Sequence, residues 1–313
     1  MKRISLLLLS VSLSLIAMGQ VVIVRPDLGT PTKIAPAYFG PNAFAVPEML
    51  DDAVSPTLDV ALSGRYHHGD YGDRTGDALA HVRIPLFTPR ANLTLWMPVV
   101  EGYRLTPAWK EHARLAADSR SHGTEVGSAF ISTDILVVSE RQRRPAIALR
   151  AAMKTASEDD WTMARYYDTP GYFFDAAVGK EWRLGGGSNG HGDCGSGFND
   201  CSHSHGGVTL RVGASAGFLC WQTDNGRQND ATMYALQVKL KTRRFTLAQD
   251  LRGYSGWEHD GDCPMVVKTE VMGHFGRFLP FLSWQKGVKD FPFQQFAIGL
   301  KAHFDILHRQ RKA

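Results

Sequence analysis

The sequence has little excess charge, no apolar run long enough for a membrane-spanning helix, and no linker between domains. Its 35 Lys and Arg against 31 Asp and Glu leave a formal charge of +4, which does not indicate a nucleic-acid-binding protein. The apolar run from Ile4 to Met18 is shorter than the roughly 20 residues that a spanning helix needs. No low-complexity tract or internal repeat divides the chain, so we expect one domain.

Residues 1–19 have the pattern of a secretory signal peptide. Lys2 and Arg3 precede the apolar run, and the small residues Ala17 and Gly19 suit cleavage after Gly19. No cysteine follows the cleavage point, which excludes the lipoprotein pattern. We therefore expect an exported chain from Gln20, and loss of the two basic residues takes the formal charge from +4 to +2.

From about residue 55 onward, apolar and polar residues alternate in short stretches separated by Gly, Asp, Asn and Pro. Leu58, Val60 and Leu62, for example, alternate with Asp59 and Ser63. A period of two is typical of strands, and stretches of roughly 10 residues match a tilted transmembrane strand. The twelve predicted strands start near Pro56, Asp77, Asn92, Ser128, Pro145, Tyr172, Val208, Ala231, Arg244, Pro264, Phe278 and Phe293.

Alternation alone fits both a soluble sandwich and an outer-membrane barrel, because the apolar face can meet either a core or lipid. Aromatic residues near the stretch ends favour the barrel, as two interfacial girdles. These residues are Tyr66, Trp96, Tyr103, Trp161, Tyr172, Trp182, Trp221, Tyr254, Trp257 and Trp284. We predict an all-β, antiparallel, transmembrane outer-membrane β-barrel of about twelve strands over residues 55–307, followed by a basic tail at 308–313.

Short and long connections alternate along the chain, as the periplasmic turns and extracellular loops of such barrels do. The tight connections are Thr88–Ala91, Arg141–Arg144, Thr242–Arg243 and Gly276–Arg277. The long ones are His67–Gly76, Arg104–Gly127, Ser157–Gly171, Thr223–Asp230 and Gly256–Cys263. The connection Gly185–Gly207 is the exception, since strand parity places it with the tight turns. Either the strand count is off by one or the protein carries a periplasmic insertion.

A barrel of this kind encloses the charged side of each strand, with both signs present and cations in excess. These charges either pair and plug the lumen or line a narrow path that prefers anions. The predicted lumen-lining residues are Arg65, His81, Arg83, Asp134, Arg150, Lys154, Asp175, Arg211, Lys239, Asp250, Arg252, Lys268 and Glu270, with Asp59, Glu181, Lys301 and His303 in the same positions of the alternation.

The stretch HGDCGSGFNDCSHSHGG, residues 191–207, concentrates histidine, cysteine and glycine. Exported thiols oxidise, so we predict a disulfide between Cys194 and Cys201, and a second one between Cys220 and Cys263 at the extracellular rim. A zinc site is the more specific alternative, but the spacing of these histidines and cysteines matches no standard zinc-binding pattern. Weak metal binding would use His191, His203 and His205; we predict no metal and no cofactor.

A catalytic site is a further hypothesis, suggested by Ser188, Asn189, Gly190 and His191. Outer-membrane phospholipases and lipid A deacylases carry His-x-Ser-Asn-Gly on membrane-facing strands, whereas here the order differs and the residues lie in a glycine-rich loop. A nucleophile needs a base that is held in place and oriented by a third group. We therefore predict that the protein is not an enzyme, and a lipid-modifying barrel enzyme is the third functional hypothesis.

The segment before the first strand, within residues 20–54, is too apolar for a free tail. Its prolines, Gly40 and Asn42 exclude a regular helix or a central strand, so it should dock on the barrel or in its lumen. AYFGPNAFAVPEML, residues 37–50, resembles the N-terminal segment of a family of uncharacterised outer-membrane β-barrels from Bacteroidetes. The resemblance implies an outer-membrane location and a barrel of this size, and it supplies no activity and no catalytic residues.

The leading functional hypothesis is a narrow outer-membrane channel for a small polar or anionic solute. The alternative is a structural or docking component of an envelope assembly, with a protein partner bound through the N-terminal segment and the 185–207 loop. Membrane lipid is the expected surroundings in either case, and nucleic acid is not an expected partner.

Overall fold

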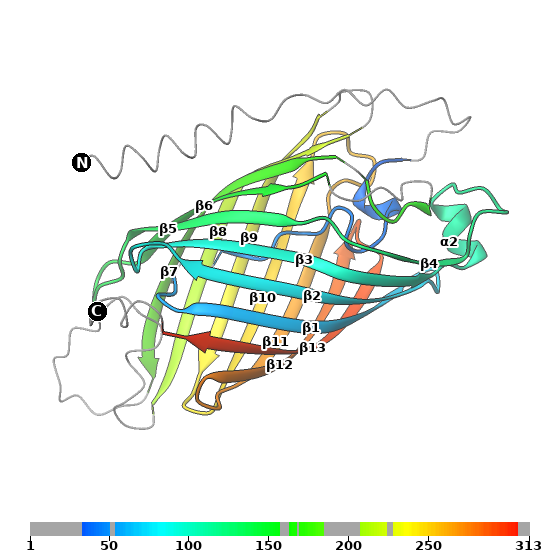
Figure 1. Ribbon diagram of the computed structural model, residues 1–313. Coiled ribbons are helices and arrows are strands. Elements are labelled where there is room, and N and C mark those ends of the chain that lie inside the picture. Colours follow the sequence, from blue (N-terminus) through cyan, green and yellow to red (C-terminus); the bar gives the residue numbers. More distant parts are fainter. Residues whose placement is uncertain are drawn as a thin grey trace.

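Twelve antiparallel strands close into a barrel (Figure 1). In the computed structural model, β1 pairs with both β2 and β13, and β2 pairs with β3, so the ring of twelve has no free edge. The short strand β4 extends only β3. The predicted fold class is confirmed. The structure describes residues 33–50, 54–156, 163–167, 169–184, 207–223 and 228–305.

Each wall strand starts within three residues of its predicted start, and the largest differences are at β2 and β9. The strands are β1 (Leu58–Gly69), β2 (Arg74–Pro85), β3 (Ala91–Arg104), β4 (His122–Glu125), β5 (Phe130–Val138), β6 (Ala146–Lys154), β7 (Gly171–Leu184), β8 (Val208–Gln222), β9 (Gln228–Lys241), β10 (Phe245–Gly256), β11 (Met265–Gly273), β12 (Phe278–Lys289) and β13 (Phe293–Phe304).

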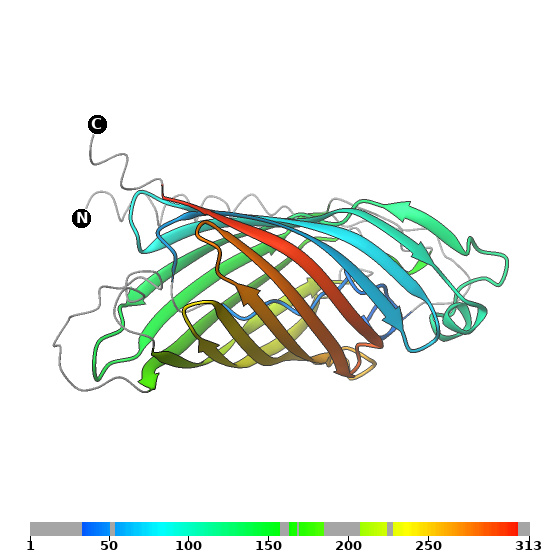
Figure 2. The same cartoon turned by 90° about the horizontal axis from the view of Figure 1, so that it is seen from below.

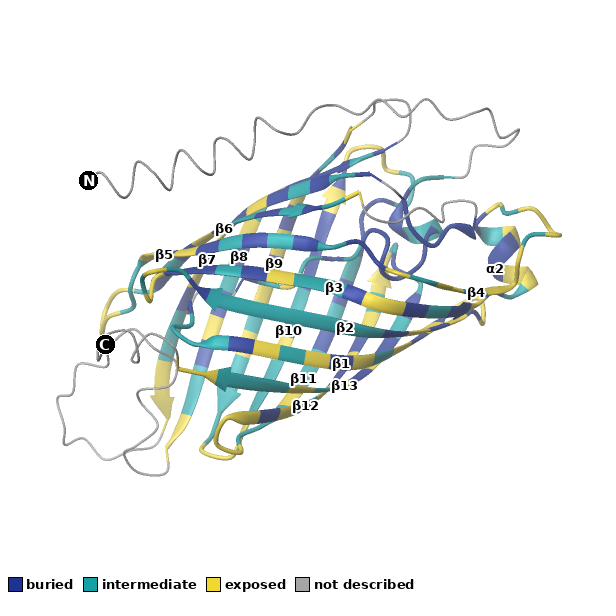
Figure 3. Cartoon of the chain, in the orientation of Figure 1, coloured by how far each residue is buried: buried dark blue, intermediate teal, exposed yellow. Residues whose placement is uncertain are grey.

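The apolar side of the wall faces outward. Val212 is 40% exposed, while its neighbour Arg211 is 6% exposed, and the same alternation runs along the strands in Figure 3. A soluble two-sheet sandwich would bury the valine and expose the arginine. The strands therefore present apolar side chains to the surroundings and enclose the ionic ones, as a membrane barrel requires.

The two ends of the barrel differ. The terminal rim is the end where β1 starts and β13 ends, and four of its turns, 86–90, 139–145, 242–244 and 274–277, are short. The loop rim is the opposite end, where residues 105–129 carry α2 and β4 (Figure 1). The connection after β7 runs from residue 185 to 207 and starts from the terminal rim. The predicted long connection His67–Gly76 is wrong, because only residues 70–73 join β1 and β2.

Two short helices lie at the loop rim: η1 (Pro36–Tyr38) and α2 (Pro107–His112). Thr106 caps α2, because its hydroxyl accepts a hydrogen bond from the backbone N–H of Trp109 at 3.1 Å. Within the part of the chain that the structure describes, no helix is long and apolar enough to cross a membrane.

Only some of the predicted interfacial aromatics face the membrane. Tyr66, Trp182 and Trp284 are exposed, at 45%, 47% and 37%. In contrast, Tyr103, Trp221 and Tyr254 are buried and Trp96 stacks on Phe130, so the prediction of a girdle position is wrong for these four. They occupy inward positions of the alternation, where they pack inside the barrel.

Leu236, near the middle of β9 and 59% exposed, tests the lipid-facing surface. We expect Leu236→Arg to lower the free energy of unfolding from lipid vesicles by about 2–4 kcal/mol, because the charge must enter hydrocarbon. Phe245→Arg, at the first residue of β10, should cost only about 0–1 kcal/mol, since it lies near the interface. Urea titrations in vesicles measure both. Equal costs would mean that depth in a bilayer does not govern the outer face.

Candidate functional site in the barrel lumen

The segment 33–50 runs lengthwise through the lumen (Figures 1 and 2). At the loop rim, the backbone N–H of Ala37 donates to the carbonyl of Gly261 at 3.1 Å. Farther along, the carboxylate of Glu48 lies 3.0 Å from Lys268 Nζ on β11. Leu50 packs against β5, β6 and β7 near the terminal rim. The segment thus contacts several sides of the wall, and we call it the plug.

The plug fills the loop-rim half of the lumen with an apolar core. Phe39 and Phe44 contact each other edge to face, with ring centroids 5.3 Å apart, and both lie beside Tyr167. Wall residues from nine strands surround them. These wall residues are Tyr103, Phe130, Ala152, Phe173, Leu219, Trp221, Ala231, Met233, Tyr254, Val266 and Phe293. Packing of this kind excludes water from this half.

Asn42 joins the plug to the polar side of β1, β2 and β3. Its amide nitrogen donates to Asp77 at 2.8 Å and to Glu101 at 2.7 Å, and its carbonyl oxygen accepts from Arg65 at 2.9 Å. Arg65 also binds Asp77 at 2.6 Å, and His67 lies 2.9 Å from the same carboxylate. A single asparagine therefore completes the hydrogen bonding of two buried carboxylates and one guanidinium.

Arg165 closes the same cluster from the connection between β6 and β7. Its Nε donates to Glu101 at 2.9 Å, its Nη2 donates to the same carboxylate and to Thr75, and its side chain is fully buried. Tyr166 donates its hydroxyl to the other oxygen of Glu101 at 2.8 Å. Gly40 of the plug lies against the guanidinium, where a Cβ would come within 2.6 Å of Arg165 Cζ. This approach requires glycine.

Glu48 makes the second polar contact between plug and wall. It lies 3.0 Å from Lys268 and 3.5 Å from Arg252, and its backbone carbonyl accepts from Arg150 at 2.9 Å. Its side chain is nevertheless 67% exposed, so water reaches it inside the barrel. The lumen is therefore dry on the loop-rim side of the plug and water-accessible beside Glu48.

Ion pairs also link the wall strands to one another around the lumen. Arg150 on β6 binds Asp175 on β7 at 2.7 and 2.9 Å, whereas Arg252 binds Asp250 of its own strand, β10, at 2.9 Å. Near the terminal rim, Asp59 lies 3.6 Å from both Arg83 and Lys301 and contacts His303, and Arg211 lies 3.0 Å from Glu140 and 3.8 Å from Glu181. Opposite charges on neighbouring strands thus largely neutralise one another.

The residues expected to line the lumen are all buried or half-buried and alternate with exposed apolar residues. They do not share one role. Lys154 donates to the carbonyls of Tyr167 and Thr169, at 2.9 and 2.8 Å, so it holds the β6–β7 connection. Sequence reasoning missed Asn42, Glu48, Glu101 and Arg165. Only Glu101, an acidic residue between Val100 and Gly102 in the third strand, carried a local signal.

The predicted disulfide between Cys220 and Cys263 is wrong, because both thiols are free. Cys220 shares the outward face of its strand pair with Tyr172. The sulfur of Cys263 instead lies 3.5 Å from the hydroxyl of Ser255 on β10. Strand β9 lies between β8, which carries Cys220, and β10. Ser188, Cys194, Cys201 and the histidines 191, 203 and 205 lie outside the described residues.

Comparisons with solved structures return matches at very low sequence identity and with TM-scores below 0.5. No family model and no curated protein matches the chain. An outer-membrane channel from Pseudomonas putida F1 is 9% identical, with a TM-score of 0.49 over 82% of this chain and 97% of that one. The transport unit of the autotransporter AIDA-I from Escherichia coli is 9% identical, with a TM-score of 0.41 over 85% and 98%.

The KdgM porin in complex with disordered oligogalacturonate is also similar, with 9% identity and a TM-score of 0.39 over 78% of this chain and 99% of that one. Their descriptions name an outer-membrane channel, the transport unit of an autotransporter and a porin. At such identities the likeness concerns the strand arrangement and assigns no solute to this chain.

Arg165→Met tests the cluster that holds the plug. The substitution leaves Glu101 buried without its guanidinium, and removing one partner of a buried ion pair costs about 3–5 kcal/mol. We expect a loss of that order in the free energy of unfolding, together with faster proteolysis within residues 33–50. The exposed Arg90, changed to Met, is the matched control and should alter neither. Unchanged proteolysis in Arg165→Met would show that the cluster does not hold the plug.

Asp73, in the β1–β2 turn at the loop rim, predicts a pH dependence. Its carboxylate packs against Gly69, and neither oxygen has a hydrogen-bond partner among the described residues. Burial raises the pKa of Asp73 from 3.8 to about 6, although the guanidinium of Arg165 opposes the rise. Because the folded pKa is the higher one, this residue stabilises the fold below about pH 4, and that contribution is lost as the pH rises through about 6.

We expect Asp73→Asn, which imitates the protonated form, to remove this loss. Between pH 4 and pH 7, the stability of the unsubstituted protein should fall by up to about 3 kcal/mol relative to the variant. The difference between their unfolding free energies in urea, at the two pH values, measures the effect, since the other carboxylates cancel. A pH-independent difference would contradict the raised pKa.

Proposed function

We propose that the protein is an outer-membrane channel that its own plug holds closed, and that small polar or anionic solutes pass when the plug is displaced. The supporting observation is the position of residues 33–50, which lie within a closed wall whose inner face is ionic and whose outer face is apolar. A barrel that only anchored other proteins would have no need of a polar passage blocked by a separate segment.

The rims support an outer-membrane orientation. Both ends of the wall sequence, Leu58 and Phe304, lie at the terminal rim with the short turns, and the larger excursion through α2 and β4 lies at the loop rim. Outer-membrane barrels place short turns in the periplasm and long loops outside. The terminal rim is therefore the periplasmic one in this proposal.

The plug can leave the lumen without breaking the wall. No residue of the segment 33–50 is paired in the ladder, which closes through β1 and β13 alone. Its backbone bonds to other parts of the chain are few, such as Gly40 N–H to the carbonyl of Ala164 at 2.7 Å. Contacts through side chains, at Asn42 and Glu48, are the main polar bonds to be replaced.

Displacement of the plug would also create an anion preference. Glu48 is the residue that the plug places beside Lys268 and Arg252. When Glu48 leaves, these two cations face the lumen with less neutralisation. Charged side chains that line a pore select ions of the opposite sign, which favours anionic solutes.

Conductance in planar bilayers tests the proposal. We expect the intact mature chain to show almost no current, because the apolar core closes the loop-rim half. A chain lacking residues 33–50 should give steady, anion-selective channels. Migration of the unheated barrel in gels shows that the deleted form is folded. A folded deletion variant that carries no current in any salt would remove the channel and leave the docking role.

Selectivity is tested within the deleted form. Lys268→Gln should reduce the anion preference measured from reversal potentials, since it removes a cation from the lumen. Lys286→Gln removes the same charge from the exposed outer side of β12 and is the matched control. Equal reversal potentials for the two variants would show that the Lys268 charge does not govern selectivity.

A further inference from the structure

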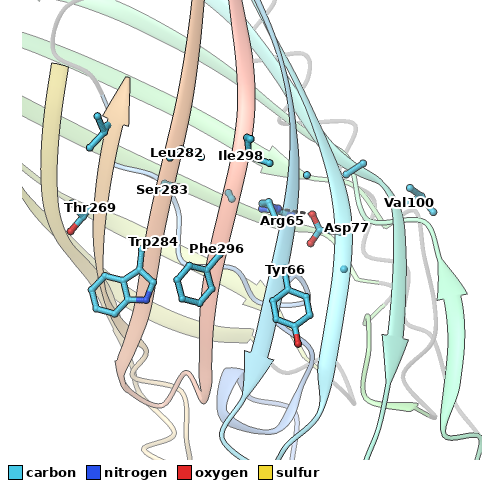
Figure 4. Close-up of a pocket in the computed structure, with 15 residues that line it drawn as sticks. Arg65, Tyr66, Asp77, Val100, Thr269, Leu282, Ser283, Trp284, Phe296 and Ile298 are labelled. Atoms are coloured by element: carbon cyan, nitrogen blue, oxygen red, sulfur yellow. Dashed lines mark hydrogen bonds and ion pairs between the residues drawn. The ribbon is translucent and has the colours of Figure 1, made fainter. Parts of the chain in front are cut away.

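A groove of about 870 Å³ crosses the outer face of β1 and β2 below the loop rim (Figure 4). Its floor includes Gly64 and Gly76, and an added Cβ at Gly64 would meet no atom within 4 Å. A second groove of about 620 Å³ lies closer to the rim and shares Tyr66 and Gly76 with the first. Together they form one depression on the face that meets lipid.

The strand register places the side chains around this depression in rows across the wall. One row is aromatic and is interrupted by glycine: Trp284, Phe296, Tyr66, Gly76 and Gly102 are successive cross-strand partners. Figure 4 shows its three rings side by side. The row below is apolar and consists of Leu282, Ile298, Gly64, Ala78 and Val100. The space left by the glycines is therefore walled by rings and aliphatic side chains.

The row above, toward the loop rim, is basic. Its members, also successive cross-strand partners, are Lys286, Gln294, His68, Arg74, Arg104 and His122. The five basic side chains are exposed, and no acidic residue belongs to any of the three rows. Two residues along a strand span about 7 Å, so these cations lie one headgroup's height above the aromatic rings.

We propose that this surface binds a phosphorylated glycolipid of the lipid A type. Acyl chains would lie in the groove over Gly64 and Gly76. One phosphate would bind Arg74 and Arg104, which are direct cross-strand partners, and the second would bind Lys286 at the other end of the row. Neighbouring strands are about 4.8 Å apart, so six strands spread the basic row over roughly 24 Å. A headgroup with two separated phosphates and several chains matches that width better than a phospholipid with one phosphate.

The rows account for both parts of such a ligand. Arginine binds phosphate through paired hydrogen bonds, and among the residues that the structure describes neither Arg74 nor Arg104 has an acidic partner. Glycine in a strand interior weakens the strand and often marks a close approach by a ligand. The site depends on the outer face alone, and its existence does not require that the lumen conduct.

Binding of purified lipid A, with both phosphates, to the full mature protein in detergent tests the site; dephosphorylated lipid A is the second probe. Native mass spectrometry gives the affinities. We expect the phosphorylated form to bind more tightly, and R74Q combined with R104Q to weaken it by about fivefold for each arginine. Dephosphorylated lipid A should lose little on the same substitution, because its acyl chains still occupy the groove.

Gly64→Leu tests the groove without disturbing the fold, because the new side chain points into open space. It should weaken both lipids alike, whereas Ala176→Leu, on the exposed outer face of β7, should weaken neither. R243Q combined with R244Q, exposed in a turn of the terminal rim, is the control for charge. The proposal is overturned if both lipids bind equally to the unsubstituted protein, or if the control pair weakens binding as much as the Arg74 and Arg104 pair.

Discussion

A closed barrel brings the polar sides of all its strands together, and each charge enclosed there needs a partner within the protein. Isolated charges in an interior are costly, and a buried pair that loses one member is strongly destabilised. Neighbouring strands supply many of these partners, as Arg150 and Asp175 show. The plug supplies others, since Asn42 bridges Asp77 and Glu101 and Glu48 lies between Lys268 and Arg252.

The same constraint explains why the two halves of the lumen differ. Where the inward residues are aromatic, as Tyr103, Trp221 and Tyr254 are, Phe39 and Phe44 of the plug pack against them and the lumen is dry. Beside Lys268 and Arg252, the plug presents Glu48, whose side chain is 67% exposed, and water remains there. An extended segment with several prolines suits this position, because it needs no helical hydrogen bonds and can change its side-chain chemistry along its length.

Much of the wall could be predicted from the sequence, because adjacent residues of a strand lie on opposite faces and so show the polarity of each face. Leu210, Val212 and Arg211 already separate an apolar face from a charged one, although they do not tell whether the apolar face meets lipid or a core, and turn residues mark the strand starts. The plug's path could not be predicted in this way. Its contacts join Asn42 to Glu101 and Glu48 to Lys268, 59 and 220 residues apart, and no local period records them. The girdle prediction was wrong for Tyr103 and Tyr254 for a similar reason, since an aromatic residue at a strand end fits both an interfacial girdle and an inner core.

The wall at β1 and β2 has to suit two different surroundings, the lumen and the lipid, within a few residues. Arg65 and Asp77 point inward, pair with each other and hold Asn42, while Gly64 and Gly76, the residues just before each of them, point outward. Larger apolar residues at the glycine positions would bury more of the wall's surface against lipid and would strengthen the strands. The inner ion pair does not require glycine on the other face, since a Cβ at Gly64 meets nothing. The open space at Gly64 and Gly76 therefore has no explanation from the inner side, and the proposed binding of lipid to the outer face offers one.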